Sequence, residues 1–522
     1  MTVERKSICF RSPEGFETES LFEDNGLSVK PGKTQKRRVR RIFYDTFEWQ
    51  LLANNAAAIQ ENRLLSLYNL DTGLPFASVA HSAAARFIRP FQLEDEKFRS
   101  VIEPFTDLRA LIKRCVVEVD IVSQHLLDKE EKTIAILNRE TYFLFKEKKN
   151  RIQITENLAI TPLKGFQEET ETFASGIGRL LGRGHRTGYR DLFMQFMDAA
   201  GVPVNDYSSK IRIKLQPGDP VQKSAASLLI GTLDIMKRNE PWIPENIDTE
   251  FLHDYRVAVR RTRSVLGTIR DIFDSGTTAR YRNAFRNAGK ACNALRDCDV
   301  YLLRESDYRA MLPESLAPHI AAFFNELHEL HRIELRRFSS FLRSKAYRAM
   351  LDEWNGLLGE TERNPVPVAT QDTEDRSTLA VAKKNIRKAW KKVLRHGRAI
   401  PAQASDAELH SLRIDCKKLR YLLELFASLF PDKTMATVVR QLKELQENLG
   451  MFVDLAVQQQ YLAGHIEQMK EKPSDPELAA ALGGLITTLH CRQQKTRKLF
   501  HRTFRHFDND ETETLFNALL NS

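Results

Sequence analysis

Two patterns of apolar and polar positions divide the 522-residue chain. The first 200 residues contain short β-branched and apolar runs, which predict β-strands: RRVRRIFYDT (37–46), LIKRCVVEVDIV (111–122) and KTIAIL (132–137). One patch at helical spacing, TETFASGIGRLLG (170–182), predicts a helix near the end of this part. From Val221 onward apolar residues recur in long stripes at helical spacing, so the remainder is predicted to be all-helical.

Two loop-like segments set the expected domain boundaries. GVPVNDYSSKIRIKLQPGDP (201–220) concentrates Gly, Pro, Ser and Asn between the two patterns, and NGLLGETERNPVPVATQDTEDRST (355–378) interrupts the helical stripes. We therefore predict an α+β multidomain chain. Its expected parts are a strand-rich domain over 1–200, a linker over 201–218 and a helical domain over 219–510, with halves of about 219–355 and 379–510.

The helical region contains an internal repeat. HDYRVAVRRTR (253–263) and HSLRIDCKKLR (410–420) lie 157 residues apart, and each has a histidine followed by cations at +3, +7, +8 and +10. The same offset relates three further pairs: Asp248 and Ser405, Arg286 and Lys443, and Asp297 and Asp454. Eight matches in one register indicate two duplicated helical-bundle halves.

Each repeated segment predicts an amphipathic helix with one cationic face. Asp248 and Ser405 are the expected N-caps, the latter in a capping box with Glu408. Four basic residues of each helix then fall within a sector of about 80°. The opposite face of each helix is apolar and should pack against a core: Tyr255, Val259, Thr262, Leu266, Ile269 and Phe273 in one helix, and Leu412, Cys416, Leu419, Leu423, Phe426 and Phe430 in the other.

The charge balance gives these cationic faces a candidate role. Lys and Arg outnumber Asp and Glu by 79 to 69, for a net charge of +10 and a pI of about 9.2. Because the excess is clustered, it favours an anionic partner, and forked Arg and compact Lys donors suit phosphate oxygens. A solvated helix face, or a histidine that merely caps or packs, would explain one such helix. The same residue types at the same offsets twice argue against that explanation.

The candidate phosphate-binding residues come from both repeats and from nearby basic runs. Residues 381–398 and 491–506 contain no acid, and with the two helices they predict a continuous positive surface. Asp297 and Asp454 are expected to orient Arg or His side chains rather than to catalyse. The complete candidate set is His253, Arg256, Arg260, Arg261, Arg263, His410, Arg413, Lys417, Lys418, Arg420, Lys384, Lys388, Arg286 and Lys443.

The cysteines and the apolar runs argue against a disulfide-rich, an exported and a membrane-spanning protein. The six cysteines form no CxxC pair, so neither a disulfide scaffold nor a thiolate zinc site is expected, and a reducing cytoplasm fits. The N-terminal MTVERKSICFRS lacks a signal-peptide core, and no apolar run reaches the length of a membrane span. We expect a cytoplasmic protein without a bound cofactor or metal.

At the repeated segments the sequence resembles the CHAD family, the conserved histidine α-helical domains. The shared motif is H-x2-R-x3-(R/K)(R/K)-x-R, with LRDCDV (295–300) and KKLRYLLELF (417–426), over roughly 219–510. The resemblance implies a helical, internally duplicated domain that binds inorganic polyphosphate and could direct the protein to polyphosphate granules. It also implies a set of residues that line the binding surface: His253, Arg256, Arg260, Arg263, His410, Arg413, Lys417 and Arg420.

The first 200 residues are similar to the CYTH family, an antiparallel β-barrel with a triphosphate tunnel. The similarity lies in VERK (3–6), FYDTFEWQLL (43–52) and PLKGFQEE (162–169). Thr2, Glu4 and Lys6 stand where the family has its ExExK signature, so one carboxylate is missing.

Two further departures from the family pattern remove charged residues that the resemblance would place in the tunnel. Only Glu156 lies near the family's late E-x-E strand, and Asn62 and Arg63 replace an arginine pair. The departures imply a barrel that has lost hydrolysis, with five arginines left to attract an anion: Arg38, Arg40, Arg63, Arg114 and Arg139.

Polyphosphate binding is therefore the favoured function, and two others stay open. One is a metal-dependent inorganic triphosphatase in the N-terminal barrel, which would need paired carboxylates that the sequence lacks. The other is nucleic-acid binding by the basic helices, which is disfavoured because no aromatic residue interrupts the cations on the exposed faces. Polymer length and oligomeric state are not set by the sequence.

Overall fold

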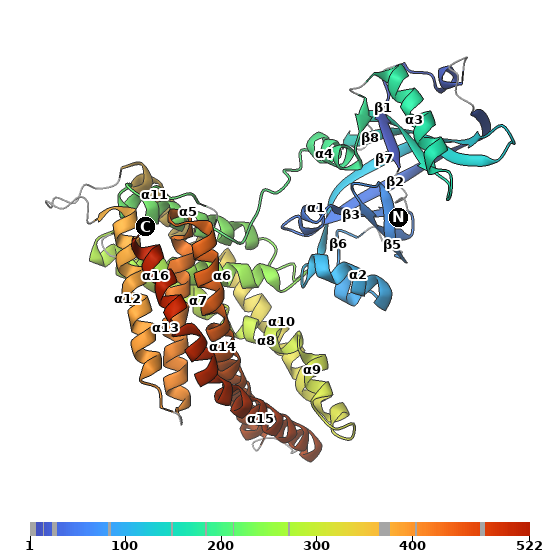
Figure 1. Ribbon diagram of the computed structural model, residues 1–522. Coiled ribbons are helices and arrows are strands. Elements are labelled where there is room, and N and C mark those ends of the chain that lie inside the picture. Colours follow the sequence, from blue (N-terminus) through green and yellow to red (C-terminus); the bar gives the residue numbers. More distant parts are fainter. Residues whose placement is uncertain are drawn as a thin grey trace. The chain divides into compact units, whose positions relative to one another are not determined.

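The alternating runs of the first part form one antiparallel sheet, which confirms the strand prediction (Figure 1). The computed structural model describes residues 7–13, 15–22, 29–81, 85–147, 150–182, 185–211, 213–269, 272–364, 376–401, 404–469 and 475–521. The chain divides into two compact units, Met1–Ser208 and Ser209–Ser522. The domain limits given from the sequence stay predictions.

In the part of the first unit that the structure describes, the sheet has ten strands. They are β1 (Ile8–Arg11), β2 (Lys30–Asp45), β3 (Ala56–Glu61), β4 (Leu64–Asn69), β5 (Leu74–Ala80), β6 (Phe87–Ile88), β7 (Leu111–Leu127), β8 (Thr133–Glu147), β9 (Asn150–Pro162) and β10 (Arg186–Thr187). The order is β10-β1-β9-β8-β7-β2-β3-β4-β5, with β6 paired to β7. The sheet curls, since the Ser7 N–H beside β1 donates to Thr72 O after β4 (2.9 Å).

Helices cover the sheet where its strands bury apolar residues. They are α1 (Gln50–Ala53), α2 (Glu96–Thr106), α3 (Gln167–Leu181) and α4 (Tyr189–Ala199). Phe173 and Ile177 of α3 pack in one core with Leu158 of β9. Phe193 and Phe196 of α4 pack in another core with residues of β2 and β7. Burying each such side chain contributes roughly 1.5–3 kcal/mol, so the helices are firmly attached.

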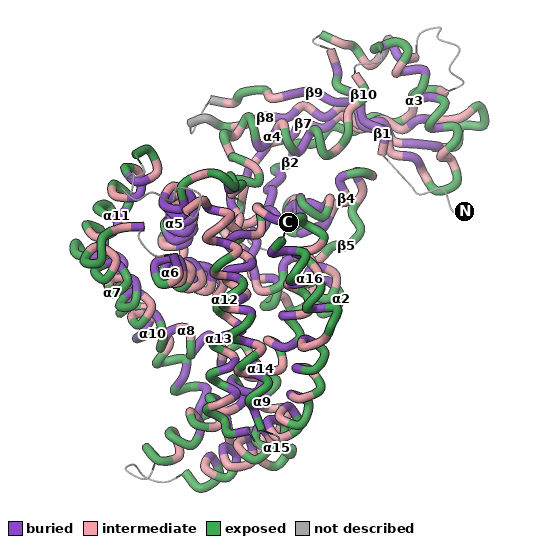
Figure 2. The backbone as a smooth tube through the Cα atoms, turned by 60° about the vertical axis from the view of Figure 1, so that its left-hand side comes forward, coloured by how far each residue is buried: buried purple, intermediate pink, exposed green. Residues whose placement is uncertain are grey.

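The second unit is helical in its described residues, as the long apolar stripes predict. Its helices are α5 (Val221–Asn239), α6 (Glu250–Thr268), α7 (Ser275–Ala291), α8 (Asn293–Leu302), α9 (Glu305–Ala310), α10 (Ala321–Arg343), α11 (Lys345–Arg363), α12 (Thr378–Arg398), α13 (Asp406–Leu425), α14 (Asp432–Met469), α15 (Pro476–Phe507) and α16 (Asp510–Asn521). Helices α12 to α15 run side by side (Figure 1). Buried and exposed residues alternate along them (Figure 2), as expected of amphipathic helices.

The helix bounds of the two halves follow the offset of the sequence repeat. Adding 157 to the bounds of α5 gives 378–396, close to α12, and adding it to those of α6 gives 407–425, close to α13. The segment spanned by α7 and α8, 275–302, corresponds to 432–459, which lies inside the single helix α14. The halves therefore differ at Cys292, where the first half breaks between two helices. The duplication itself stays a prediction.

Two local expectations were wrong. The interruption predicted over 355–378 is shorter, because α11 continues to Arg363 and α12 begins at Thr378. Asp248 is not the N-cap of α6; Thr249 holds that position without a side-chain bond. Asp248 Oδ1 instead accepts from the Glu250 N–H (2.9 Å), so the carboxylate still satisfies a donor of the first turn. Ser405 caps α13 in a capping box with Glu408, as predicted.

No helix in the described ranges is both long and apolar enough to span a membrane.

Candidate functional site

The cationic faces of α6 and α13 meet at one cavity of about 340 Å³. Its basic lining residues come in equal number from the two helices: His253, Arg260 and Arg261 from α6, and Arg413, Lys417 and Arg420 from α13. Glu424 and Glu447 are the acidic lining residues. The remaining lining residues are Val257, Tyr421, Gln446 and Gly450. The cavity is thus strongly cationic.

The apolar faces of the two helices explain why their cations meet. Tyr255, Val259 and Leu266 of α6 are buried, and so are Leu412, Leu419 and Leu423 of α13. Because these faces pack into the helical core, as predicted, the basic residues are turned away from it. Side chains cross between the helices: the Arg260 guanidinium lies 5.4 Å from the Tyr421 ring centroid, and Arg261 lies 3.9 Å from Glu424.

His253 is held in one orientation by a neighbouring helix. Arg296 Nη2 of α8 lies 3.1 Å from His253 Nδ1, and Arg296 Nη1 donates to Thr249 O (3.3 Å). A guanidinium is always a donor, so Nδ1 accepts and the imidazole proton sits on Nε2. His253 therefore acts in the cavity as a neutral N–H donor in this arrangement.

The pKa of Lys417 reflects the excess of positive charge in the cavity. Burial and the neighbouring Arg413 and Arg260 guanidinium groups lower the pKa of its ammonium from 10.5 to about 8, against a smaller opposing effect of Asp454. A lysine surrounded by other cations is stabilised in its neutral form. An anion in the cavity would reverse this, because it would favour the charged ammonium.

One donor of Arg413 has no acceptor among the residues that the structure describes. Its Nη2 donates to Asp454 (2.8 Å), whereas its Nε is buried and donates to no acceptor among the described residues. A buried unsatisfied donor costs about 1–3 kcal/mol, so such a group marks a place where a ligand or water binds.

The two carboxylates of the cavity are already engaged. Glu424 accepts from Arg420 Nε (2.6 Å) as well as lying near Arg261, and Glu447 pairs with Lys443 (3.4 Å). Arg420 Nη1 also donates to Gln446 Oε1 (3.2 Å). Glu424 thus fixes two arginines, Arg420 and Arg261, at one end of the cavity.

Several predicted site residues are not part of the cavity lining. Arg256 Nη1 donates to Asn293 Oδ1 (2.7 Å), and Arg261 Nη1 donates to Ser209 O (2.7 Å) while still lining the cavity. Five more candidates lie on exposed helix surfaces outside the lining: Arg263, His410, Lys418, Arg286 and Lys443.

The two repeated aspartates lie where they can act on the paired arginines. Asp454 binds Arg413 directly (2.8 Å). Burial raises the pKa of the Asp297 carboxyl, and the nearby Arg256 and Arg296 partly oppose this shift. The orienting role expected of the two aspartates therefore stays a prediction. Asp454 contacts an arginine directly, whereas Asp297 interacts with Arg256 and Arg296 through charge.

The basic run of α12 lines a different hollow. Lys384 and Lys388, both in the candidate set, share it with other cations of α12, and it has no lining residue in common with the cavity. Lys392 and His396 pair with Asp415 on α13 (2.8 and 3.0 Å). Asp415 lies two residues from Lys417, which is on the opposite side of that helix. The two hollows are therefore distinct, and the expected continuous positive surface stays a prediction.

Three contributors were missed by the sequence analysis. Tyr421 lines the cavity beneath Arg260, although no aromatic residue was expected among the cations. Arg296 holds His253, and Gln446 binds Arg420. Tyr421 follows Arg420 directly in the sequence, which was the available signal. Arg296 and Gln446 reach the site from other helices, so only the tertiary structure reveals them.

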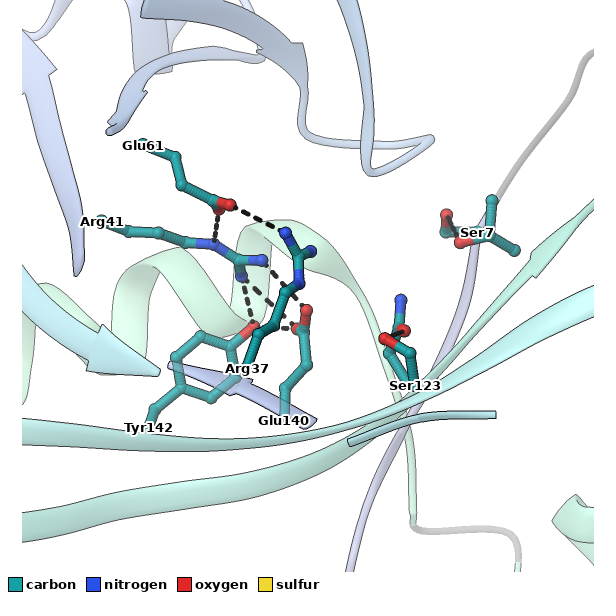
Figure 3. Close-up of polar contacts among 9 residues, drawn as sticks. Ser7, Arg37, Arg41, Glu61, Ser123, Glu140 and Tyr142 are labelled. Atoms are coloured by element: carbon teal, nitrogen blue, oxygen red, sulfur yellow. Dashed lines mark hydrogen bonds and ion pairs between the residues drawn. The ribbon is translucent and has the colours of Figure 1, made fainter. Parts of the chain in front are cut away.

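The curved sheet of the first unit encloses a paired charge network rather than free cations (Figure 3). Arg41 binds Glu61 (2.9 Å), Glu140 (3.1 Å) and the Tyr142 hydroxyl (3.2 Å), and Arg37 binds Glu61 (3.3 Å). The Arg41 and Glu140 side chains are only 10% and 6% exposed. Burial would raise the pKa of the Glu140 carboxyl, but Arg41 brings it below its ordinary value. The carboxylates here therefore neutralise Arg41.

The arginines expected to attract an anion are largely engaged as well. Arg38 binds Asp120 (2.6 Å), Arg139 binds Glu156 (2.9 Å), and Arg114 donates to Thr46 O and lies 4.2 Å from the Trp49 ring centroid. Arg40 and Arg63 are exposed. Thr2, Glu4 and Lys6 lie outside the described residues, and within those residues no group of three or more His, Cys, Asp or Glu could hold a metal ion.

A family model and two solved structures are similar to parts of this chain. The family model of the CHAD domain matches residues 227–463. The crystal structure of the CHAD domain from the plant Ricinus communis is 22% identical, with a TM-score of 0.47, over 57% of this chain and 95% of that chain. PptA from Streptomyces chartreusis is 17% identical, with a TM-score of 0.43, over 55% of this chain and 100% of that chain. No curated protein matches the chain.

Proposed function

Because residues 227–463 form a CHAD domain, a family linked to polyphosphate, we propose that the cavity between α6 and α13 binds inorganic polyphosphate. The observation that carries the proposal is the convergence of two cationic faces on one cavity. Three basic residues from each helix line it, and the acidic lining residues are Glu424 and Glu447. A linear polyanion would neutralise several of these cations at once.

The cavity side chains offer a phosphate three kinds of hydrogen-bond donor. Arg260 and Arg413 present planar forks that can donate two parallel bonds to a phosphate, whereas Lys417 acts as a compact charge. His253 donates from Nε2, since Arg296 occupies Nδ1. Each bond to a charged oxygen is worth about 1.5–3 kcal/mol. No covalent step is required, and association with polyphosphate granules would follow from binding alone.

Nucleic-acid binding is less well supported by the same residues. A sequence-independent reader of single strands stacks bases on aromatic side chains. The one aromatic residue of the cavity lining, Tyr421, already lies against the Arg260 guanidinium. Polyphosphate needs charge and donors only, and the cavity offers both.

The first unit we infer to be a CYTH-like barrel without triphosphatase activity. Glu61 and Glu140, two carboxylates of its interior, bind Arg41 and are not available as a metal-binding pair. Release of phosphate from tripolyphosphate with Mg²⁺ or Mn²⁺, abolished by Glu4→Gln, would contradict this inference.

The test compares two adjacent lysines of α13. Lys417 lines the cavity and Lys418 does not, so Lys417→Gln and Lys418→Gln change net charge equally at neighbouring positions. We expect Lys417→Gln to weaken binding of long-chain polyphosphate to the full chain about tenfold and to lower the slope of log K against log salt by about one. Fluorescence or calorimetric titration at several salt concentrations measures both quantities.

Equal effects of the two substitutions would contradict the proposal, because they would show a response to net charge alone. Circular dichroism of each variant verifies that the helices are intact. A titration with DNA or RNA of the same charge decides between polymers, and tighter binding of nucleic acid would favour the alternative function.

A further inference from the structure

The outer face of α12 forms a second basic region. A hollow of about 890 Å³ is lined by Ala380 and seven cations: Lys383, Lys384, Arg387, Lys388, Lys391, Lys392 and Arg395. It shares no lining residue with the cavity between α6 and α13. The lining contains no carboxylate and no aromatic residue.

The fold holds this face rigidly. Ile386, Trp390 and Val393 of α12 are buried, and the Trp390 ring stacks on Phe516 of α16 with centroids 4.6 Å apart. The backbone positions from which the exposed cations extend are therefore fixed along one helix. The row Lys383 to Arg395 spans twelve residues, or about 18 Å at 1.5 Å per residue, with a cation at each turn.

Part of this charge is neutralised by a buried carboxylate. Asp415, whose side chain is 4% exposed, binds Lys392 and His396 at the inner border of the face. Among the described residues, Arg387 donates to the neutral Asn521 Oδ1 (3.5 Å). Lys391 and Arg395 form no ion pair within the described ranges. Like charges one turn apart repel each other on a helix, so packing alone does not account for the row.

The corresponding helix of the first half shows that the bundle does not need these cations. At an offset of 157, Lys383, Arg387 and Lys391 correspond to Ala226, Ile230 and Asp234 of α5, and Arg395 corresponds to Arg238, which pairs with Asp234 (3.0 Å). Both helices bury an apolar face, but the buried face of α5 is wider and includes Ala226, and only α12 has the basic row. The row is thus a feature added to one half of the unit.

We infer that the α12 face is a second binding site for the same polymer, so that one long polyphosphate chain is held at two places. The inference rests on the proposed function of the cavity. A straight row of charges suits an extended polyanion, and the lack of aromatic residues in the lining favours polyphosphate over single-stranded nucleic acid. Two linked sites raise affinity by a factor of about 10²–10⁴ for a ligand that reaches both, and not for a shorter one.

The experiment uses the full chain with tripolyphosphate and with long-chain polyphosphate. The α12 variant replaces four cations by glutamine: Lys383→Gln, Arg387→Gln, Lys391→Gln and Arg395→Gln. A control variant removes four positive charges from α10: Arg332→Gln, Arg336→Gln, Arg337→Gln and Arg343→Gln. We expect the α12 variant to bind long-chain polyphosphate about 100-fold more weakly than the wild type and tripolyphosphate as tightly as the α10 control does. Circular dichroism verifies the helix content of both variants.

The inference is overturned if the α12 variant loses no more affinity for the long polymer than the α10 control does. It is also overturned if single-stranded RNA of equal charge displaces the polymer from the wild type but not from the α12 variant, since the face would then bind nucleic acid. The double variant Arg260→Gln, Lys417→Gln tests the cavity separately. Unchanged tripolyphosphate binding in that variant would contradict the proposed function of the cavity. The comparison of the α12 variant with the α10 control would still show whether the α12 face binds the long polymer.

Discussion

Lys417 is the residue in which the electrostatics of the cavity are most evident. Its pKa of about 8 results from burial and from Arg413 and Arg260. The unfolded chain holds this proton more tightly than the folded protein does between pH 8 and 10.5. The resulting loss of stability is therefore complete below pH 8 and is relieved as the pH rises through that window.

The same shift predicts a pH dependence of binding. A phosphate beside Lys417 raises its pKa, so above about pH 8 the complex takes up a proton that the free protein lacks. We expect the affinity for polyphosphate to be constant from pH 6 to 7 and to fall by up to tenfold per pH unit above about pH 8. Titrations in Lys417→Met supply the control, and an equally steep fall in that variant would assign the effect to another group.

At the scale of elements, the capping of α13 can be compared directly with that of α6. Ser405 Oγ accepts from the Glu408 N–H at the start of α13, whereas Thr249 at the start of α6 makes no such bond. We expect Ser405→Ala to lower the free energy of unfolding by about 1 kcal/mol and Thr249→Ala to lower it by clearly less. Urea unfolding followed by circular dichroism measures both, and equal losses would contradict the assigned caps.

The sequence was most informative about these elements. Alternating runs predicted β2, β7 and β8, and the stripe that includes Tyr255 and Leu419 correctly predicted which faces of α6 and α13 are buried. Such patterns are local, because burial repeats with the period of the element. The repeat also singled out α6 and α13, the two helices whose basic residues line the cavity.

The sequence could not predict which cations would meet. Arg260 and Lys417 line one cavity, while Arg263 and Lys418, a few residues away, do not. That distinction depends on the rotation of two helices that lie far apart in the chain. The same is true of Arg296, which reaches His253 from α8, and of Arg41, whose partner Glu140 is 99 residues away.

For the whole molecule, the two units should respond differently to ligand. The proposed sites lie in Ser209–Ser522, whereas the interior of Met1–Ser208 pairs Arg41 with Glu61 and Glu140. Ligand at 100 times its Kd stabilises the unit that binds it by about 2.7 kcal/mol. We expect calorimetry of the full chain with tripolyphosphate to raise one unfolding transition by several degrees and to leave the other in place.

The variant Lys417→Gln assigns the transition that shifts, because it should abolish most of that shift. A shift of both transitions would show that the first unit also binds the anion, contrary to its paired interior.

The mutual repulsion of the cavity cations has a consequence for the lifetime of the protein. The lowered pKa of Lys417 means that its charged form destabilises the folded state relative to opened states, and proteases cleave chains mainly while these are open. Abundant polymer would protect the chain, and depletion would expose it to degradation. The supply of stored phosphate would then set how much of this protein persists.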